Sequence, residues 1–377
     1  TLFRSSSSRN TAGRMAGGAQ DNSTFYFDGL SWATVFGGDG MDNYLSPQNN
    51  QEVIGSSQYG NVYYSNNNGA SGTVVNSNPN FESSEWVTPI AADYNASGVL
   101  FVGNENIAKS TDGGQTWSAL GTIFSNTLTQ ANTELSAIAV SAANNSILYG
   151  ARRVRYELGM PGVIIKSSNF GFNFSNVTGN LPDSLYYTGI EAHPTKTNEV
   201  VVCMAGFAAG CKVFKSTVGG SVWTNISYNL PNVPVNCIKY VPGTGQLVVA
   251  TDFGLYYLNN NSSTWVAYNS GLPNVICSDI DFNVALNKIY LSTFGRGIWE
   301  TSLSVLKALQ PNVGVVEQSV VTADFNIVPN PNTGKFSLQC AANLMGAKLE
   351  VIDVIGRIVY SSTIKQNTQE INLQVPA

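Results

Sequence analysis

The sequence predicts an all-β protein, and three observations support that fold class. Only 11% of its 377 residues are charged, whereas an ordinary soluble domain carries about 25%. Gly, Asn and Ser, which favour turns over helix interiors, are abundant and take the place of the missing charges. Short apolar runs rich in Val, Ile and Tyr, which are typical of strands, recur between these polar stretches. We therefore do not expect a helical fold.

Net charge and hydropathy argue against two classes of protein. The formal net charge is −5, whereas nucleic-acid binding depends on a basic surface. The sequence contains no run of 18 apolar residues, so it has no stretch that would cross a bilayer as a helix. At roughly 150 residues per domain, the length suits one large domain or two unequal ones.

An eight-residue pattern, S-x-D-x-G-x-T-W, recurs in the N-terminal part of the chain. The complete copy is residues 110–117, and weaker copies begin at Ser65, Ser167, Ser216 and Leu258. The five starts are separated by 45, 57, 49 and 42 residues. Because four-stranded propeller blades repeat at about 40–50 residues, this spacing predicts a β-propeller.

The residue types of the pattern have physical reasons. Gly114 supplies the positive φ of a tight hairpin turn at no steric cost. Asp112 can accept hydrogen bonds from backbone N–H groups of the same turn. Trp117 begins the next strand and covers the hairpin with apolar surface. We therefore expect a structural role for the five defining residues, Ser110, Asp112, Gly114, Thr116 and Trp117.

The strands around each copy predict seven four-stranded blades over residues 1–305. Two apolar runs precede the turn, as at 99–102 and 107–110, and a polar connector, often carrying Leu-Pro, leads to the next run. We label the strands of a blade A to D from the innermost outward. The last blade shows only three strands, so we expect the start of the chain, or chain before it, to supply the fourth.

The eight-residue pattern resembles the Asp-box, or BNR repeat, of secreted sialidase-like, sortilin-like and xyloglucanase-like β-propellers. That resemblance implies that the pattern forms the turn between strands C and D, away from any ligand. Residues 17–22 (G-G-A-Q-D-N) and 37–40 (G-G-D-G) look like two runs of secreted BNR propellers. We know of no catalytic role for these runs, and Asp or Asn beside Gly usually forms turns.

Residues 306–322 lose the strand pattern and are predicted to be a linker to a small domain, residues 323–377. The domain contains P-N-P-N-T-G-K-F-S-L at 329–338 and L-E-V-I-D-V-I-G-R-I-V-Y at 349–360. Turn residues between apolar runs predict β-structure here, including a D-x-x-G-R turn. Both patterns resemble the C-terminal sorting domain of type IX secretion, a small immunoglobulin-like β-sandwich.

The resemblance to a sorting domain implies a partner and an address. The partner is the type IX secretion machinery, and the address is extracellular or on the outer cell surface. The closing strand of that family is absent, so we expect an incomplete sandwich and a longer natural protein. An adhesion-like accessory sandwich is the alternative interpretation of the same residues.

Five cysteines and a single histidine limit the redox and metal chemistry. No cysteine pair has C-x-x-C spacing, and one histidine excludes a multi-histidine site, so we assign no metal and no cofactor. Cys203 and Cys211 flank a predicted B–C turn, and export would permit a disulfide between them. Cys237 and Cys277 either bridge neighbouring A strands or stay as buried thiols, and Cys340 has no evident partner.

Loops that converge at the central channel are the expected ligand site. The B–C turns and D–A connectors share one face, the B–C/D–A face, and the A–B and C–D turns share the other. Candidate ligand-facing residues on the B–C/D–A face are Gln20, Asp21, Asp39, Asp42, Glu105, Arg152, Asp252 and Arg296. Four aromatics would either stack on sugars or fill blade interfaces: Tyr59, Tyr186, Tyr187 and Phe253.

Two functions from different classes fit this arrangement. The first is a non-enzymatic propeller that binds a glycan or protein ligand at the cell surface. The second is a glycoside hydrolase, or half of a two-propeller enzyme, which needs two carboxylates at a set separation. A sialidase fits poorly, because Arg152, Arg153 and Arg155 are adjacent whereas that family draws its arginines from separate blades. The scarcity of charge favours binding, so we assign no catalytic residue.

Overall fold

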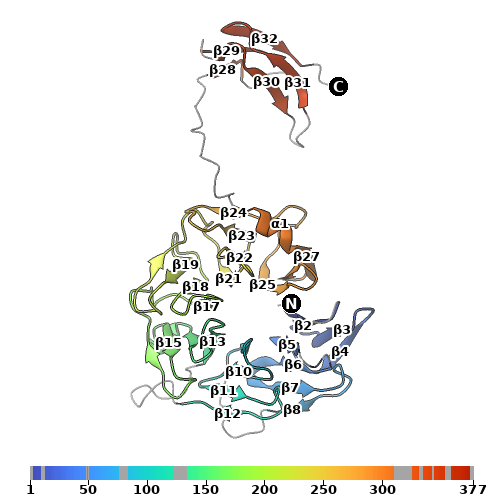
Figure 1. Ribbon diagram of the computed structural model, residues 1–377, viewed down its shortest axis with the longest axis vertical. Coiled ribbons are helices and arrows are strands. Elements are labelled where there is room, and N and C mark those ends of the chain that lie inside the picture. Colours follow the sequence, from blue (N-terminus) through green and yellow to red (C-terminus); the bar gives the residue numbers. More distant parts are fainter. Residues whose placement is uncertain are drawn as a thin grey trace. The chain divides into compact units, whose positions relative to one another are not determined.

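A computed structural model describes residues 3–9, 13–47, 49, 51–75, 84–121, 134–309, 325–330, 334–341, 344–352 and 358–373. The chain divides into two compact units, Thr1–Gln310 and Pro311–Ala377, and we describe each by itself. The N-terminal unit consists of antiparallel sheets set around a central channel (Figure 1). This arrangement confirms the prediction of an all-β propeller.

Six four-stranded sheets and one three-stranded sheet follow one another in the described part of the N-terminal unit. In each sheet the strands pair in chain order, and the first strand lines the channel. The number of blades in the complete protein stays a prediction. The first three sheets are β1 (Phe3–Ser7), β2 (Met15–Ala19), β3 (Thr24–Phe27) and β4 (Trp32–Phe36); β5 (Asn43–Leu45), β6 (Val53–Ser56), β7 (Val62–Ser65) and β8 (Thr73–Val74); and β9 (Ile90–Ala92), β10 (Leu100–Gly103), β11 (Ile107–Ser110) and β12 (Ser118–Ala119).

The other four sheets continue the same order along the chain. The fourth and fifth are β13 (Leu135–Val140), β14 (Leu148–Arg152), β15 (Val163–Ser167) and β16 (Ser175–Asn176); and β17 (Tyr187–Ala192), β18 (Val200–Met204), β19 (Val213–Ser216) and β20 (Thr224–Asn225). The sixth and seventh are β21 (Val235–Tyr240), β22 (Leu247–Thr251), β23 (Gly254–Leu258) and β24 (Trp265–Ala267); and β25 (Cys277–Asn283), β26 (Lys288–Thr293) and β27 (Ile298–Ser302).

The second strand of a sheet is apolar because neighbouring sheets cover both of its sides. All residues of β10, β18 and β22 are buried, as expected for strands without a solvent-facing side. Fourth strands such as β12, β16 and β20 are short and exposed. The hydrophobic core therefore consists of layers between adjacent sheets.

Residues 110–117 form the C–D turn of the third sheet. Ser110 Oγ accepts the Gly114 N–H at 2.8 Å, and Asp112 Oδ1 accepts the Thr116 N–H at 2.9 Å. The Thr116 hydroxyl donates to Asp112 Oδ2 at 2.6 Å. Burial acts to raise the pKa of Asp112, but the bonds from Thr116 and Ser110 outweigh it and lower the pKa. Trp117 is buried between the second and third sheets, so every defining residue is engaged within the scaffold.

Three of the weaker copies form the same turn. The N–H groups of Gly69, Gly171 and Gly220 each donate at 2.9 Å to the Oγ of the serine that begins the copy. All three glycines have positive φ, a conformation that costs a glycine little. The eight-residue pattern therefore marks one recurring backbone geometry.

An asparagine in the D–A connector fastens one sheet to the next at two places. Asn180 Oδ1 accepts the Trp223 N–H at 2.8 Å, and Asn180 Nδ2 donates to the Trp223 carbonyl at 2.8 Å. Asn229 holds Trp265 in the same way, at 2.7 and 2.9 Å. Each tryptophan Nε1 also donates to a carbonyl of that connector. At these two places the asparagine before the Leu-Pro pair is therefore an inter-sheet brace.

A helix takes the place of this tryptophan at the last sheet. After β27 comes α1 (Leu303–Ala308), whose Leu303 and Leu306 are buried in the core layer between the sixth and seventh sheets. Gly271 precedes the Leu-Pro pair of the connector into this sheet, where the other two connectors have asparagine. The bracing asparagine and the tryptophan that it would hold are therefore both replaced at the last sheet, the first by Gly271 and the second by residues of α1.

The first strand does not complete the last sheet, which corrects our expectation for the start of the chain. β1 pairs with β2 as the innermost strand of the first sheet. The described part of the last sheet keeps three strands. The reason is geometric, because β1 contacts the inner strand β25, whereas a fourth strand would lie beyond β27 at the outer edge.

Side chains of β25 close the ring instead. The carboxylates of Asp279 and Asp281 accept the N–H groups of Ser5 and Ser7 on β1, at 3.2 and 2.7 Å. Asn283 Nδ2 donates to the Ser8 carbonyl at 2.7 Å. These bonds occupy the channel-side edge of β1, which β2 leaves without partners. We call Asp279 and Asp281, with the N–H groups of Ser5 and Ser7, the closure clasp.

The C-terminal unit contains two sheets in its described residues. One is β28 (Phe325–Val328), β29 (Lys335–Cys340) and β32 (Thr368–Asn372), and the other is β30 (Lys348–Ile352) and β31 (Ile358–Thr363). Leu338, Ile364 and Ile371 are buried in its core. The β-structure is as predicted, whereas the immunoglobulin-like topology stays a prediction. The D-x-x-G-R turn and residues 310–322 of the predicted linker lie outside the described residues, whereas the first residues of that predicted linker, 306–308, belong to α1.

The closure clasp gives a stability prediction. Asp281→Ala should lower the free energy of unfolding by about 1–3 kcal/mol, because the Ser7 N–H and hydroxyl lose their acceptor. Asp281→Asn keeps an acceptor oxygen and removes a charge whose burial raises the pKa of Asp281, so we expect nearly unchanged stability. Chemical denaturation at pH 7 measures both variants. Equal losses would show that the charge is what matters, and no loss in either would show that the ring does not depend on this clasp.

Candidate functional site

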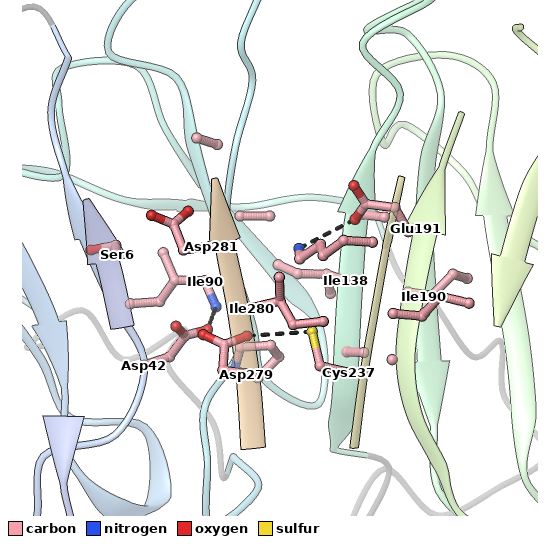
Figure 2. Close-up of a pocket in the computed structure, with 18 of the residues that line it drawn as sticks. Ser6, Asp42, Ile90, Ile138, Ile190, Glu191, Cys237, Asp279, Ile280 and Asp281 are labelled. Carbon is pink, nitrogen blue, oxygen red and sulfur yellow. Dashed lines mark hydrogen bonds and ion pairs between the residues drawn. The ribbon is translucent and has the colours of Figure 1, made fainter. Parts of the chain in front are cut away.

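The central channel holds a cavity of about 380 Å³ (Figure 2). All seven inner strands contribute to its lining, and aliphatic side chains such as Ile90, Ile138 and Ile280 form part of its wall. Its charged lining residues are three cations and four carboxylates: Arg4, Arg9 and Lys239, and Asp42, Asp279, Asp281 and Glu191. The lining therefore carries one more carboxylate than cation.

Most of the charged groups in the channel are paired with one another. Lys239 Nζ lies 3.3 Å from Glu191 Oε2, and Arg4 Nη1 lies 3.7 Å from Asp279 Oδ1. The Glu191 carboxylate outweighs burial and raises the pKa of Lys239. Figure 2 shows Glu191 on the opposite side of the channel from Asp42 and Asp279. These two ion pairs involve Glu191 and Asp279 and do not include Asp42 or Asp281.

Asp42 is the one predicted ligand-facing residue that lines the channel. Its two carboxylate oxygens accept the N–H groups of Asn43 and Ile90, both at 2.9 Å. Burial raises the pKa of Asp42 to about 6, and Asp279 adds to this rise, while Arg4 and the two backbone bonds act against it. Asp42 can therefore hold a proton inside the channel under mildly acidic conditions.

Gln20, Asp21 and Asp39 build a loop contact on the B–C/D–A face. Asp39 Oδ1 accepts the N–H of Asp21, which has positive φ, at 2.8 Å. The N–H of Asp39 donates to Gln58 Oε1 at 3.1 Å, and the carbonyl of Gln20 accepts a bond from the Asn22 side chain at 3.2 Å. The runs at 17–22 and 37–40 thus support each other through turn chemistry.

The remaining predicted residues do not converge with these three. Glu105 and Arg152 are buried, and Arg152 Nη2 donates to the Pro161 carbonyl at 2.9 Å. Asp252 accepts a bond from the Asn236 amide at 2.8 Å. Arg296 is exposed on the last B–C turn. The eight candidates are therefore spread over turns, core and channel and form no common site.

The sequence interpretation missed most of the charged residues in the channel. Asp279 and Asp281 stand two apart on β25, as do Arg4 and Ser6 on β1, so each pair lies on one side of its strand. Polar residues at alternate positions of an inner strand were therefore the available signal.

One exposed aromatic side chain sits on each of five B–C turns. Their exposed fractions range from 45 to 71%. The first and third sheets, with turns at 20–23 and 104–106, lack such a residue. Of the aromatics considered from sequence, Tyr187 is fully buried and Tyr186 is partly buried beside Arg153. The five exposed residues are Tyr59, Tyr156, Phe207, Phe253 and Phe294.

All five cysteines are free thiols, which corrects the expected disulfide. Cys203 is buried on β18, and its sulfur lies 3.3 Å from the Thr188 hydroxyl, in the core layer between the fifth and sixth sheets. Cys211 lies near the far end of the eight-residue turn 205–212. The Cys203 side chain thus packs into the core instead of reaching across the turn. Cys237 and Cys277 are likewise buried thiols.

The described residues contain no group of three or more His, Cys, Asp or Glu side chains arranged to hold a metal ion. Within the same residues, neither α1 nor any other helix has the length and apolar character needed to traverse a bilayer.

The raised pKa of Asp42 predicts a pH dependence of stability. The ordinary pKa of an Asp is about 3.9, so between about pH 4 and 6 the folded state keeps a proton that the unfolded chain has released. Stability from this group is full below about pH 4 and is lost as the pH rises through about 6.

Urea denaturation of the native protein and of Asp42→Asn at pH 4, 5, 6 and 7 tests this dependence. The native protein should lose stability relative to the variant across this range, by no more than about 3 kcal/mol. Parallel pH profiles would show that Asp42 titrates normally.

Solved structures similar to this chain are β-propellers. A GH74 enzyme of Niastella koreensis aligns with a TM-score of 0.60 and 18% identity, over 91% of this chain and 59% of that chain. The protein YCF48, solved with a D1 peptide, has a TM-score of 0.55 and 14% identity, over 80% and 91%. The extracellular domain of the one-component system BT4673 from B. thetaiotaomicron has a TM-score of 0.56 and 14% identity, over 90% and 43%. At these identities the similarity shows the fold alone.

The sequence comparisons concern the C-terminal unit. No curated protein matches the sequence. Residues 326–376 match the family of secretion system C-terminal sorting domains, which marks proteins exported by type IX secretion. This match confirms the predicted partner machinery and address. The protein is therefore a β-propeller that carries a type IX secretion C-terminal sorting domain and is located outside the cell or on its surface.

Proposed function

We propose that this exported propeller binds a glycan through the aromatic side chains of its B–C turns. The observation that carries the proposal is the regular placement of Tyr59, Tyr156, Phe207, Phe253 and Phe294, one on each of five turns. Single exposed apolar residues need no explanation. Their recurrence at one topological position, on the face where connectors converge, favours a ligand surface.

Aromatic rings suit a sugar ligand because each offers a flat apolar face on which a sugar ring can stack, while the hydroxyl groups of the sugar stay free for hydrogen bonds. The polar residues of the same face include Asp21, Asn22 and Gln58 in turns, which supply hydrogen-bond donors and acceptors. A peptide, as in the YCF48 structure solved with a D1 peptide, is the alternative ligand class.

Hydrolysis has weaker support than binding. A glycoside hydrolase needs an acid with a raised pKa and a second carboxylate at a set distance. Asp39 and Asp252 on the face each accept a hydrogen bond from a neighbouring group. Asp42, whose pKa is raised, lines the channel. The GH74 enzyme is also much longer than this chain, which spans 59% of it.

A polysaccharide screen distinguishes these functions. Affinity electrophoresis of the full chain in gels containing xyloglucan, mixed-linkage β-glucan, arabinoxylan, galactomannan or homogalacturonan measures retention, and a reducing-sugar assay measures release. Retention without release supports the proposal. Release of reducing sugar would identify a hydrolase. If the gels show no retention and the assay shows no release, a protein ligand becomes the candidate.

Removal of the turn aromatics should weaken binding. Tyr156→Ala, Phe207→Ala and Phe253→Ala should each raise the Kd for the retained polysaccharide about 5–20-fold, because each removes a stacking surface. Phe172→Ala is the matched control, since Phe172 is exposed on a C–D turn of the opposite face. An equal effect of the control would contradict a binding site on the B–C/D–A face.

Export should depend on the C-terminal unit. Deletion of residues 323–377 should leave the propeller inside the cell envelope, because residues 326–376 are the sorting domain. Fractionation of cells and medium, with blotting for the propeller, measures the location. Normal release of the truncated protein would contradict this dependence.

A further inference from the structure

A cluster of four charged side chains, of which Arg153 is 30% exposed and the other three are largely buried, lies on the B–C/D–A face at the longest B–C turn of the described residues. Glu85 and Glu134 belong to the D–A connectors that enter the third and fourth sheets, and Arg153 and Arg155 begin the B–C turn of the fourth sheet. The side chains of the two glutamates are 6% exposed and that of Arg155 is 11% exposed. Three loops from different places in the chain therefore meet at one ionic group.

Arg155 joins the two glutamates. Its Nη2 donates to Glu85 Oε1 at 3.2 Å and also to Glu134 Oε2. Arg153 Nε donates to the same Glu85 oxygen at 2.5 Å, and its guanidinium lies 5.4 Å from the centre of the Tyr186 ring. Two positive and two negative charges thus compensate each other, and of the four only Arg153 keeps substantial contact with water.

The turn above this cluster is long and carries an exposed aromatic ring. It spans ten residues, 153–162, between β14 and β15. The backbones of Arg155 and Met160 exchange hydrogen bonds of 2.9 and 3.0 Å across its base. Tyr156, the most exposed of the five turn aromatics at 71%, follows Arg155 directly, and its hydroxyl donates to the Ser184 carbonyl. The position of Arg155 therefore determines where the backbone of Tyr156 lies.

The charge balance argues against a role for these arginines in binding an anion. Each guanidinium group already has a carboxylate partner, Glu85 for Arg153 and both Glu85 and Glu134 for Arg155. Burying such a cluster contributes little net stability, and its best-supported use is to select one conformation. If Arg155 lost its charge, Arg153 would still pair with Glu85, whereas the buried Glu134 would lose the cation that the structure pairs with it.

We propose that Arg155 is a positioning residue, which locks the turn 153–162 to two preceding connectors and so holds Tyr156 ready for the ligand. This inference rests on the proposed function. The lock pre-organises the turn, so the ligand need not order it on binding. Arginine suits the task better than lysine because the two N–H groups of one terminal nitrogen, Nη2, reach both carboxylates, and its guanidinium is planar, less strongly hydrated than an ammonium and always charged.

The test uses three variants of the full chain and two readouts. Hydrogen–deuterium exchange of the amides in 153–162 reports the lock, and affinity electrophoresis with the most strongly retained of the five polysaccharides reports binding. Arg155→Met should speed exchange in this turn and raise the Kd, each by about tenfold. Arg155→Lys keeps the charge without the fork and should fall between Arg155→Met and the native protein. Glu157→Gln is the control, because Glu157 is 63% exposed and lies 3.9 Å from Arg155.

The two readouts separate failure of the lock from failure of the proposed function. Unchanged exchange in both Arg155 variants overturns the lock. Faster exchange with an unchanged Kd overturns its role in binding, and an equal effect of Glu157→Gln overturns the assignment to Arg155. If Arg155→Met does not fold, Arg155→Lys carries the same comparison. A native protein that none of the five polysaccharides retains overturns the proposed function, and with it the positioning role, whatever the exchange shows.

Discussion

Two carboxylates join the last sheet of the propeller to the first. Asp279 and Asp281 accept the N–H groups of Ser5 and Ser7 across the point where the ring begins and ends. Every other neighbouring pair of sheets is linked by a connecting chain, whereas this pair has only non-covalent contacts. A ring that opened here would widen the channel and separate the turns of the two sheets. The geometry of the B–C/D–A face therefore depends on this clasp.

Elsewhere the sheets are fastened by polar groups of a different kind. Asn180 and Asn229 each bracket the backbone of a tryptophan in the next sheet, and Arg155 gathers two connectors under one turn. At the seventh sheet, Leu303 and Leu306 fill the core layer instead. Each fastening lies between sheets, where apolar packing alone sets no unique register. Together they fix where the B–C turns stand relative to one another, and a multivalent ligand surface needs that order.

The repeating parts of this fold were predictable from sequence, and the singular parts were not. Residues 110–117 form a turn through local bonds, so the spacing of this pattern and its weaker copies predicted the blades. Local turn patterns also predicted the sorting domain. The clasp joins residues 274 positions apart, and no local pattern reports such a contact. The pairing of Arg153 and Arg155 was not predictable either, because their partners Glu85 and Glu134 are distant in sequence. The ring of turn aromatics was partly visible, since Tyr59 and Phe253 were considered, but sequence did not separate them from the buried Tyr187.

The central claim is that a glycan lies across the B–C turns of this exported propeller. A crystal structure of the full chain with an oligosaccharide from the most strongly retained polysaccharide tests it most directly. We expect sugar rings in contact with at least two of Tyr156, Phe207 and Phe253, with Arg155 still bound to Glu85 and Glu134. A sugar bound at the C–D turns, or at neither face of the propeller, would contradict it.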